Sequence, residues 1–144
     1  MSTLIIGIGN QSRRDDGVGA FVIDQLAALK LPDVDLETAH QLEIETAETI
    51  SRYDTVIFVD AAVPGAPEAI RRLEVTPDFQ SHAVAHYLTP GDVLSLCQTL
   101  FGKQPRAILF SIRGSDFNFG TTLTPEVEAA ARDVVKQIVE LTKV

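Results

Sequence analysis

The sequence predicts an α/β fold, a single three-layer α/β/α sandwich with a mostly parallel, twisted sheet. Short apolar runs rich in β-branched residues alternate along the chain with segments whose apolar residues recur at helical spacing. This alternation is typical of a parallel sheet that helices cover on both faces. The length of 144 residues suits one hydrophobic core, and we find no repeat, linker or low-complexity segment. We therefore expect residues 1–144 to form one domain.

The first part of the chain contains two strand–helix units. Residues 3–8 are apolar and β-branched, which predicts a central strand. A helix that ends before Pro32 is indicated by apolar residues at helical spacing: Val18, Phe21, Val22, Leu26 and Leu29. Residues 34–38 predict a weaker strand, and residues 43–52 predict a second helix.

The middle of the chain contains the clearest strand, residues 55–60, which ends in Asp60. A loop rich in proline and glycine follows it, and residues 69–75 then predict an edge strand. The next helix begins at Thr89, which is a suitable N-cap, with Pro90 at the first helical position.

The last part of the chain predicts one more strand and one more helix. Residues 106–112 are an apolar strand, and residues 113–122 form a polar loop. A final helix starts near Thr124, and its apolar stripe consists of Val127, Ala131, Val134, Val135, Ile138 and Leu141.

The composition restricts the partners and the compartment. A formal net charge of −8 argues against nucleic acid, because phosphates require a basic surface. The single cysteine, Cys97, excludes an internal disulfide, which fits a reducing compartment, and its apolar neighbours predict a buried thiol. No targeting signal or membrane span is evident. We expect a cytoplasmic protein that does not bind a membrane.

Two acids and one histidine are candidate site residues. Asp16 follows the first strand through a glycine turn, and Asp60 ends the strongest strand. Ligands of open α/β sheets bind beyond the carboxyl ends of the strands, so these carboxylates are expected to converge there. His86, which precedes a helix, can reach the same edge. Two carboxylates and an imidazole suit a borderline metal ion such as zinc or nickel.

Each of these residues also has a purely structural interpretation. Asp15 is expected to cap amides at the start of its own helix, which leaves Asp16 for the site. Asp60 would then bind the backbone of the following loop, and His86 would be an ordinary hydrogen-bonded histidine. His40, which follows the second strand, is a further candidate for the same edge.

The glycine loop also permits a nucleotide-binding interpretation. Gly7 and Gly9 begin like a dinucleotide fingerprint, but Ser12 stands where the third glycine belongs. The two acids of the loop would repel a pyrophosphate, so a nucleotide-binding module is the least favoured hypothesis. The zinc-protease helix HExxH and the nucleophile elbow GxSxG are both absent from the sequence.

Motifs spread over nearly the whole chain resemble those of the hydrogenase maturation proteases. Four segments carry this resemblance: Gly7-Ile8-Gly9-Asn10 with Arg14-Asp15-Asp16-Gly17-Val18-Gly19, Val56-Ile57-Phe58-Val59-Asp60-Ala61, His86-Tyr87-Leu88-Thr89-Pro90, and Phe119-Gly120 with Leu123-Thr124-Pro125-Glu126-Val127. Some members of the family have Glu where this chain has Asp16.

The resemblance implies an endopeptidase that removes the C-terminal extension of the large subunit of a nickel–iron hydrogenase after nickel insertion. It implies that Asp16, Asp60 and His86 contact the metal and serve catalysis, and that the substrate supplies the nickel. Our hypothesis is that the metal polarises the scissile carbonyl or a water while Asp16 or Asp60 accepts a proton. The alternatives are a metal-dependent hydrolase of a small amide or peptide and a non-enzymatic nickel-checking chaperone.

Overall fold

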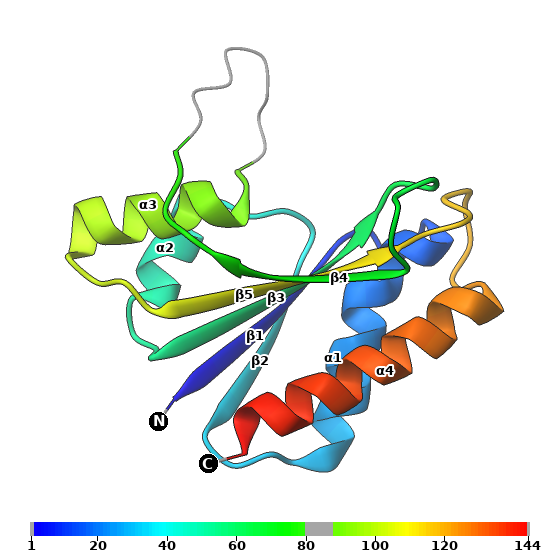
Figure 1. The fold of residues 1–144 in the computed structure, drawn as a ribbon, viewed down its shortest axis with the longest axis horizontal. Helices are drawn as coiled ribbons and strands as arrows, with labels where there is room; N and C mark the ends of the chain where they lie inside the picture. The colour runs from blue at the N-terminus through cyan, green and yellow to red at the C-terminus, as the bar shows by residue number, and fades with distance from the viewer. Residues whose placement is uncertain (1, 80–87, 144) are drawn as a thin grey trace.

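The computed structural model describes residues 2–79 and 88–143 and contains one five-stranded sheet (Figure 1). The strands are arranged in the order β2-β1-β3-β5-β4. Their bounds are β1 Thr3–Ile8, β2 Val34–Ala39, β3 Thr55–Ala62, β4 Ile70–Val75 and β5 Arg106–Arg113. The helices are η1 Arg14–Gly17, a 3-10 turn, and α1 Val18–Leu29, α2 Ile44–Ile50, α3 Pro90–Phe101 and α4 Pro125–Thr142.

Helices cover both faces of the sheet, which confirms the predicted α/β/α layering. One face packs against α1 and α4, and the other packs against α2 and α3 (Figure 1). Neighbouring residues of β3 alternate between the two cores: Ile57 lies in the first core and Phe58 in the second, and both are fully buried. Burial on both faces is why the strand reads as an unbroken apolar run.

Four strands are parallel and therefore end at the same edge of the sheet. β1 pairs with β2 and β3, and β3 pairs with β5, all in parallel. We call the edge where these strands end the carboxyl edge. β4 is antiparallel to β5 and lies at the side of the sheet, as predicted for an edge strand. The loops after β1, β3 and β5 consequently meet at the carboxyl edge.

The start of α3 confirms the predicted cap. The Thr89 hydroxyl accepts the backbone N–H of Asp92 at 3.1 Å, and the Asp92 carboxylate accepts the N–H of Thr89 at 2.8 Å. This reciprocal arrangement satisfies two amides that the first helical turn would otherwise leave unpaired. Cys97, on the same helix, is fully buried, as its apolar neighbours predicted.

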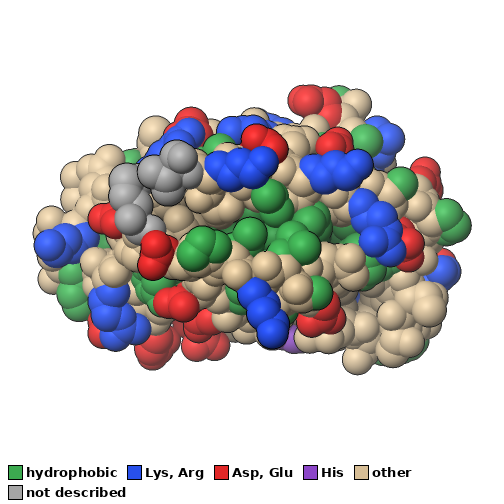
Figure 2. All heavy atoms as spheres, turned by 90° about the horizontal axis from the view of Figure 1, so that it is seen from below, with side chains coloured by type: hydrophobic (Ala, Val, Ile, Leu, Met, Phe, Trp, Pro, Cys, Tyr) green, Lys and Arg blue, Asp and Glu red, His purple; other side chains and the backbone are tan. Residues whose placement is uncertain are grey.

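The surface mixes charged side chains of both signs with apolar ones. Figure 2 shows one face on which hydrophobic side chains gather near the middle, between Lys, Arg, Asp and Glu side chains. Apolar atoms make up more than half of a typical protein surface, so this band by itself does not mark a site. Of the helices described, none combines the length and the apolar character that crossing a bilayer requires.

Candidate active site at the carboxyl edge of the sheet

The turn after β1 places Asp16 at the carboxyl edge. Gly9 has a φ of +140°, and a Cβ on it would lie 2.0 Å from the carbonyl oxygen of Asp16. Only glycine therefore permits this close approach of the turn to η1. The backbone N–H of Asn10 donates to Oδ2 of Asp16 at 2.8 Å. The turn and the carboxylate thus fix each other's position.

Asp60 lies on β3, the second strand after β1 in the sequence. It is nevertheless close to β1 in space, because β1 and β3 are neighbouring strands of the sheet. The Ser111 hydroxyl, on the paired position of β5, donates to Oδ1 of Asp60 at 2.9 Å. Burial raises the pKa of the Asp60 carboxyl, the Ser111 hydrogen bond opposes this change, and the charge of Asp16 raises the pKa further. The result is a pKa of about 6.

Both carboxylates line one cavity of about 400 Å³. His40, which follows β2, lines it too, together with Ile8, Gln41, Leu42, Leu88, Thr89 and Pro90. An isolated bridge between Leu42 and Leu88 joins the two walls of this cavity. Among the described residues no hydrogen bond is made to Oδ1 of Asp16 or to Oδ2 of Asp60. One oxygen of each carboxylate is therefore available to a ligand.

The structure brings together two of the three predicted site residues. Asp16 and Asp60 line the same cavity, and the influence of one charge on the other's pKa reflects their proximity. His86 lies outside the described residues, as does His82. His40 is the described histidine at this edge, where the sequence placed it as a further candidate.

The donor chemistry of the cavity suits a cation. A positive charge placed between two carboxylates relieves their mutual repulsion. Ligand sets that combine carboxylate oxygens with an imidazole nitrogen bind borderline divalent ions. Within residues 2–79 and 88–143, however, no group of three or more His, Cys, Asp or Glu side chains is arranged to hold a metal. Asp16, Asp60 and His40 line the cavity without forming a preassembled set of ligands.

The expectation that Asp15 caps its own helix was wrong. α1 begins at Val18, and its N-cap position, Gly17, has no side-chain cap. The buried Asp15 carboxylate instead accepts the backbone N–H groups of Ser115, Asp116 and Thr124 at 2.8 to 2.9 Å. Burial alone raises the pKa of Asp15, but these three amides and the Thr124 hydroxyl lower it below its ordinary value. Asp15 therefore ties η1 to the 114–124 loop and to the start of α4.

Reasoning from the sequence missed Ser111, whose hydroxyl is the hydrogen-bond partner of Asp60. It lies in the middle of an apolar strand, where a single serine gives no distinctive signal. The register of β3 against β5 would have revealed it, because directly paired residues present their side chains on the same face.

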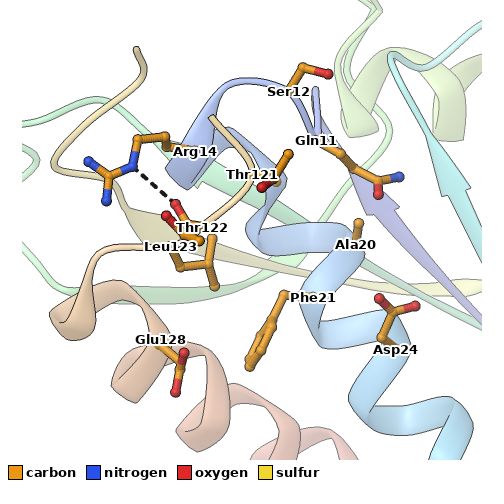
Figure 3. A pocket seen from close by; sticks show the side chains of 11 residues that line it. Gln11, Ser12, Arg14, Ala20, Phe21, Asp24, Thr121, Thr122, Leu123 and Glu128 are labelled. Atoms are coloured by element: carbon orange, nitrogen blue, oxygen red, sulfur yellow. Dashed lines mark hydrogen bonds between the residues drawn. The ribbon is translucent and has the colours of Figure 1, made fainter. Parts of the chain in front are cut away.

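A second cavity, of about 430 Å³, lies between η1, α1 and the segment that leads into α4. Phe21 and Leu123 face it from opposite sides, and Arg14 Nε donates to the Thr122 carbonyl at 3.2 Å beside it (Figure 3). Neither Asp16 nor Asp60 is among its lining residues. We therefore place the candidate active site in the cavity at the carboxyl edge.

Comparison with solved structures identifies the same fold in hydrogenase maturation proteases. The Escherichia coli hydrogenase maturating endopeptidase HybD superposes with a TM-score of 0.80 and 22% identity, over 98% of this chain and 91% of that chain. HycI from Thermococcus kodakarensis superposes with a TM-score of 0.76 and 26% identity, over 99% of this chain and 93% of that one. HybD from Thermococcus kodakarensis gives a TM-score of 0.75 and 21% identity, over 99% and 100% of the two chains.

Other comparisons give no match: no protein-family model matches the chain, and no curated protein matches it significantly. The structural likeness covers 91% to 100% of these proteases, so the resemblance that the sequence motifs indicated is confirmed at the level of the fold. The fold of this chain is that of the hydrogenase maturation proteases.

Proposed function

We propose that this protein, which has the fold of the hydrogenase maturation proteases, is itself a processing endopeptidase. Its substrate is the precursor of the large subunit of a nickel–iron hydrogenase, from which it removes a C-terminal extension after nickel has been inserted. The observation that carries this proposal is the cavity in which Asp16 and Asp60 converge at the carboxyl edge, in a chain with this fold.

The nickel ion belongs to the substrate in this proposal. Asp16 and Asp60 each offer one oxygen without a hydrogen bond among the residues that the structure describes, and both line the cavity. A bound cation would remove the repulsion that raises the pKa of Asp60. Carboxylates are harder ligands than thiolates, so they suit transient contact with a borderline ion such as nickel.

His86 is the third proposed ligand. It precedes Leu88, a lining residue of the cavity, by two positions. Two residues span at most about 7 Å, so the chain that leads to His86 starts within reach of the cavity. His40 lines the same cavity and is the described imidazole that is able to serve there instead.

The chain's own residues would contribute positioning and proton transfer. The metal, when present, would polarise the scissile carbonyl or a water molecule. Asp60 is half-buried, and its carboxyl has a pKa of about 6 in the protein without a cation, so it is suited to accept a proton near neutral pH. The Ser111 hydroxyl keeps the carboxylate oriented by its hydrogen bond of 2.9 Å.

The test is to incubate the protein with nickel-loaded and nickel-free precursor and to measure the mass of the products. We expect loss of a short C-terminal peptide from the loaded form and no change in the nickel-free form. Stable binding without a mass change would instead support a nickel-checking chaperone. Turnover of small amides or peptides without any precursor would support a general metal-dependent hydrolase.

A further inference from the structure

A row of three polar side chains crosses the sheet beside the candidate active site. Asp60 on β3 pairs with Ser111 on β5, which pairs in turn with Arg71 on β4. Directly paired residues present their side chains on the same face of a sheet, so all three face the side that α2 and α3 cover. The row begins at the cavity with the two carboxylates and ends at an arginine.

Arg71 and Ser111 line a separate pocket of about 230 Å³, whose other lining residues are Ala62, Ala66, Pro67 and Glu68. The loop that forms one wall is held in place by β5. The Arg113 side chain donates to the Ala66 carbonyl at 2.9 Å, and the Gly114 N–H donates to the Ala62 carbonyl at 2.9 Å. These two hydrogen bonds therefore fix this wall of the pocket in position.

The guanidinium of Arg71 is available to a ligand. Arg71 is exposed, and its side chain forms no ion pair or hydrogen bond with any residue of the described ranges 2–79 and 88–143. Glu68 lines the same pocket but does not pair with it. The next residue on the strand, Arg72, has a different role, since its guanidinium lies 5.6 Å from the centre of the Phe110 ring.

We propose that this pocket binds a carboxylate of the substrate's C-terminal extension through the guanidinium of Arg71. Arginine binds carboxylates through two parallel N–H···O bonds, which makes it the side chain suited to this ligand. The inference rests on the proposed function. The folded body of the precursor carries the metal to Asp16 and Asp60, whereas a pocket of about 230 Å³ admits only a flexible peptide.

The sheet geometry sets the length of the segment between the two sites. β3 and β4 are separated by one strand, so Asp60 and Arg71 are about 10 Å apart along the sheet. An extended peptide advances about 3.3 Å per residue, which places the bound carboxylate about three residues beyond the cleaved bond. The carboxylate is either the α-carboxylate of a short extension or an acidic side chain within a longer one.

The first experiment measures cleavage of nickel-loaded precursor by wild type, Arg71→Gln and the matched control Arg72→Gln. We expect Arg71→Gln to raise KM about 10- to 50-fold with kcat nearly unchanged, since a charged hydrogen-bonded pair is lost from binding. Arg72→Gln should stay within about twofold of wild type, because small surface changes rarely exceed ~0.5 kcal/mol. Equal KM values for the two variants would overturn the inference.

A further variant, at Glu68, is expected to change KM in the opposite direction. Glu68→Gln removes a negative charge from the pocket, so we expect it to lower KM for the same precursor. A purely structural role for these residues would not produce opposite shifts at Arg71 and Glu68. A rise of KM in Glu68→Gln would contradict carboxylate binding.

The second experiment does not depend on cleavage. The Arg71 side-chain N–H resonance is followed by NMR while a peptide is added. The three peptides are acetyl-trialanine as the free acid, acetyl-trialanine amide, and acetyl-alanyl-aspartyl-alanine amide. A shift with the free acid alone identifies an α-carboxylate, and a shift with the aspartyl peptide identifies an acidic side chain. A shift with neither of these two peptides would overturn the inference. Binding at Arg71 by a protein that cuts no precursor would leave the pocket standing and reject the proposed function.

Discussion

The side chains of Arg14 and Asp15 reach the 114–124 loop, whereas the side chain of Asp16 reaches a different part of the molecule. Arg14 forms an ion pair with Asp116, and its Nε donates to the Thr122 carbonyl. Asp15 accepts amides from the 114–124 loop and from Thr124. Asp16 alone faces the cavity at the carboxyl edge. This division explains how two adjacent acids are both satisfied, one by the protein and one by a ligand.

Replacing Asp15 by alanine is expected to lower the free energy of unfolding by about 3 kcal/mol, since it leaves buried amides without an acceptor. Because folding lowers the pKa of Asp15, its contribution to stability is fully present above the ordinary value of 3.8 and is lost as pH falls through the lower pKa of the folded state. Urea unfolding of the variant and wild type at pH 7 and pH 3 measures both effects. An equal difference at the two pH values would contradict this role.

Asp60→Asn is expected to stabilise the protein above pH 6 while it impairs tail removal. The pKa of Asp60 is raised from 3.8 to about 6, so the ionised carboxylate opposes folding. This destabilisation is absent below 3.8, the pKa of Asp60 in the unfolded chain, and develops as pH rises towards about 6, its pKa in the folded protein. Above pH 6 it lowers the free energy of unfolding by up to about 3 kcal/mol. Unfolding measured at pH 4 and pH 8 should reveal a gain only at pH 8. A loss of stability at pH 8 would disprove the proposed cost of this carboxylate.

The sequence predicted the candidate site residues better than it predicted their hydrogen-bond partners. Asp16 was identified because it follows a strand and Asp60 because it ends one in the prediction, and strand ends are where ligands bind. The partners of Asp15 are about a hundred positions away, and Ser111 is an unremarkable serine in a strand. Such pairings depend on the register of the sheet, which local sequence does not specify.

The elements at the carboxyl edge owe their arrangement to two close approaches of backbone. The turn after β1 passes against η1 at Gly9, and α1 passes against β1 at Gly19, where a Cβ would lie 2.6 Å from the backbone nitrogen of Ile8. Side chains at these two positions would push the helix away from the strand. The cavity consequently depends on glycines that contribute no chemistry of their own.

Gly9→Ala is expected to destabilise the protein by at least about 3 kcal/mol and to displace Asp16, because it adds a clash to a backbone conformation that alanine disfavours. Gly65→Ala is the matched control. Gly65 also has a positive φ, +91°, but nothing lies within 4 Å of the added Cβ. The control should lose only about 1–2 kcal/mol and retain activity. Thermal unfolding and precursor cleavage are measured for both variants, which separates the effect of the clash from that of backbone strain. Similar losses of stability and activity in the two variants would argue against the clash.

Most elements could be predicted from sequence because their signals are local. β1 has the predicted bounds, α3 begins at the predicted cap, and β3 extends two residues beyond the predicted end at Asp60. The 3-10 turn η1 was not predicted, since its conformation depends on the contacts of Asp15 with a distant loop. The strand order, with β5 inserted between β3 and β4, is equally a product of long-range packing.

For the whole molecule, the net charge of −8 bears on how a precursor is bound. If basic residues of the precursor surround its extension, opposite charges accelerate encounter and salt screens them over about 8–10 Å. We expect KM for the precursor to rise with ionic strength between 50 and 500 mM salt while kcat stays constant (on the order of a few-fold in KM). A KM that is independent of salt would show that the acidic surface does not contribute to recognition.

The most direct test compares wild type with Asp16→Asn, Asp60→Asn and the surface control Asp133→Asn on nickel-loaded precursor, with product mass as the readout. Asp133 is exposed on α4, away from the residues that line the cavity. We predict that wild type and Asp133→Asn release the extension, and that each cavity variant slows its release at least about 100-fold, as loss of a group contacting the reacting atoms does. Undiminished release by Asp16→Asn or Asp60→Asn would contradict the assignment of the two carboxylates to the active site.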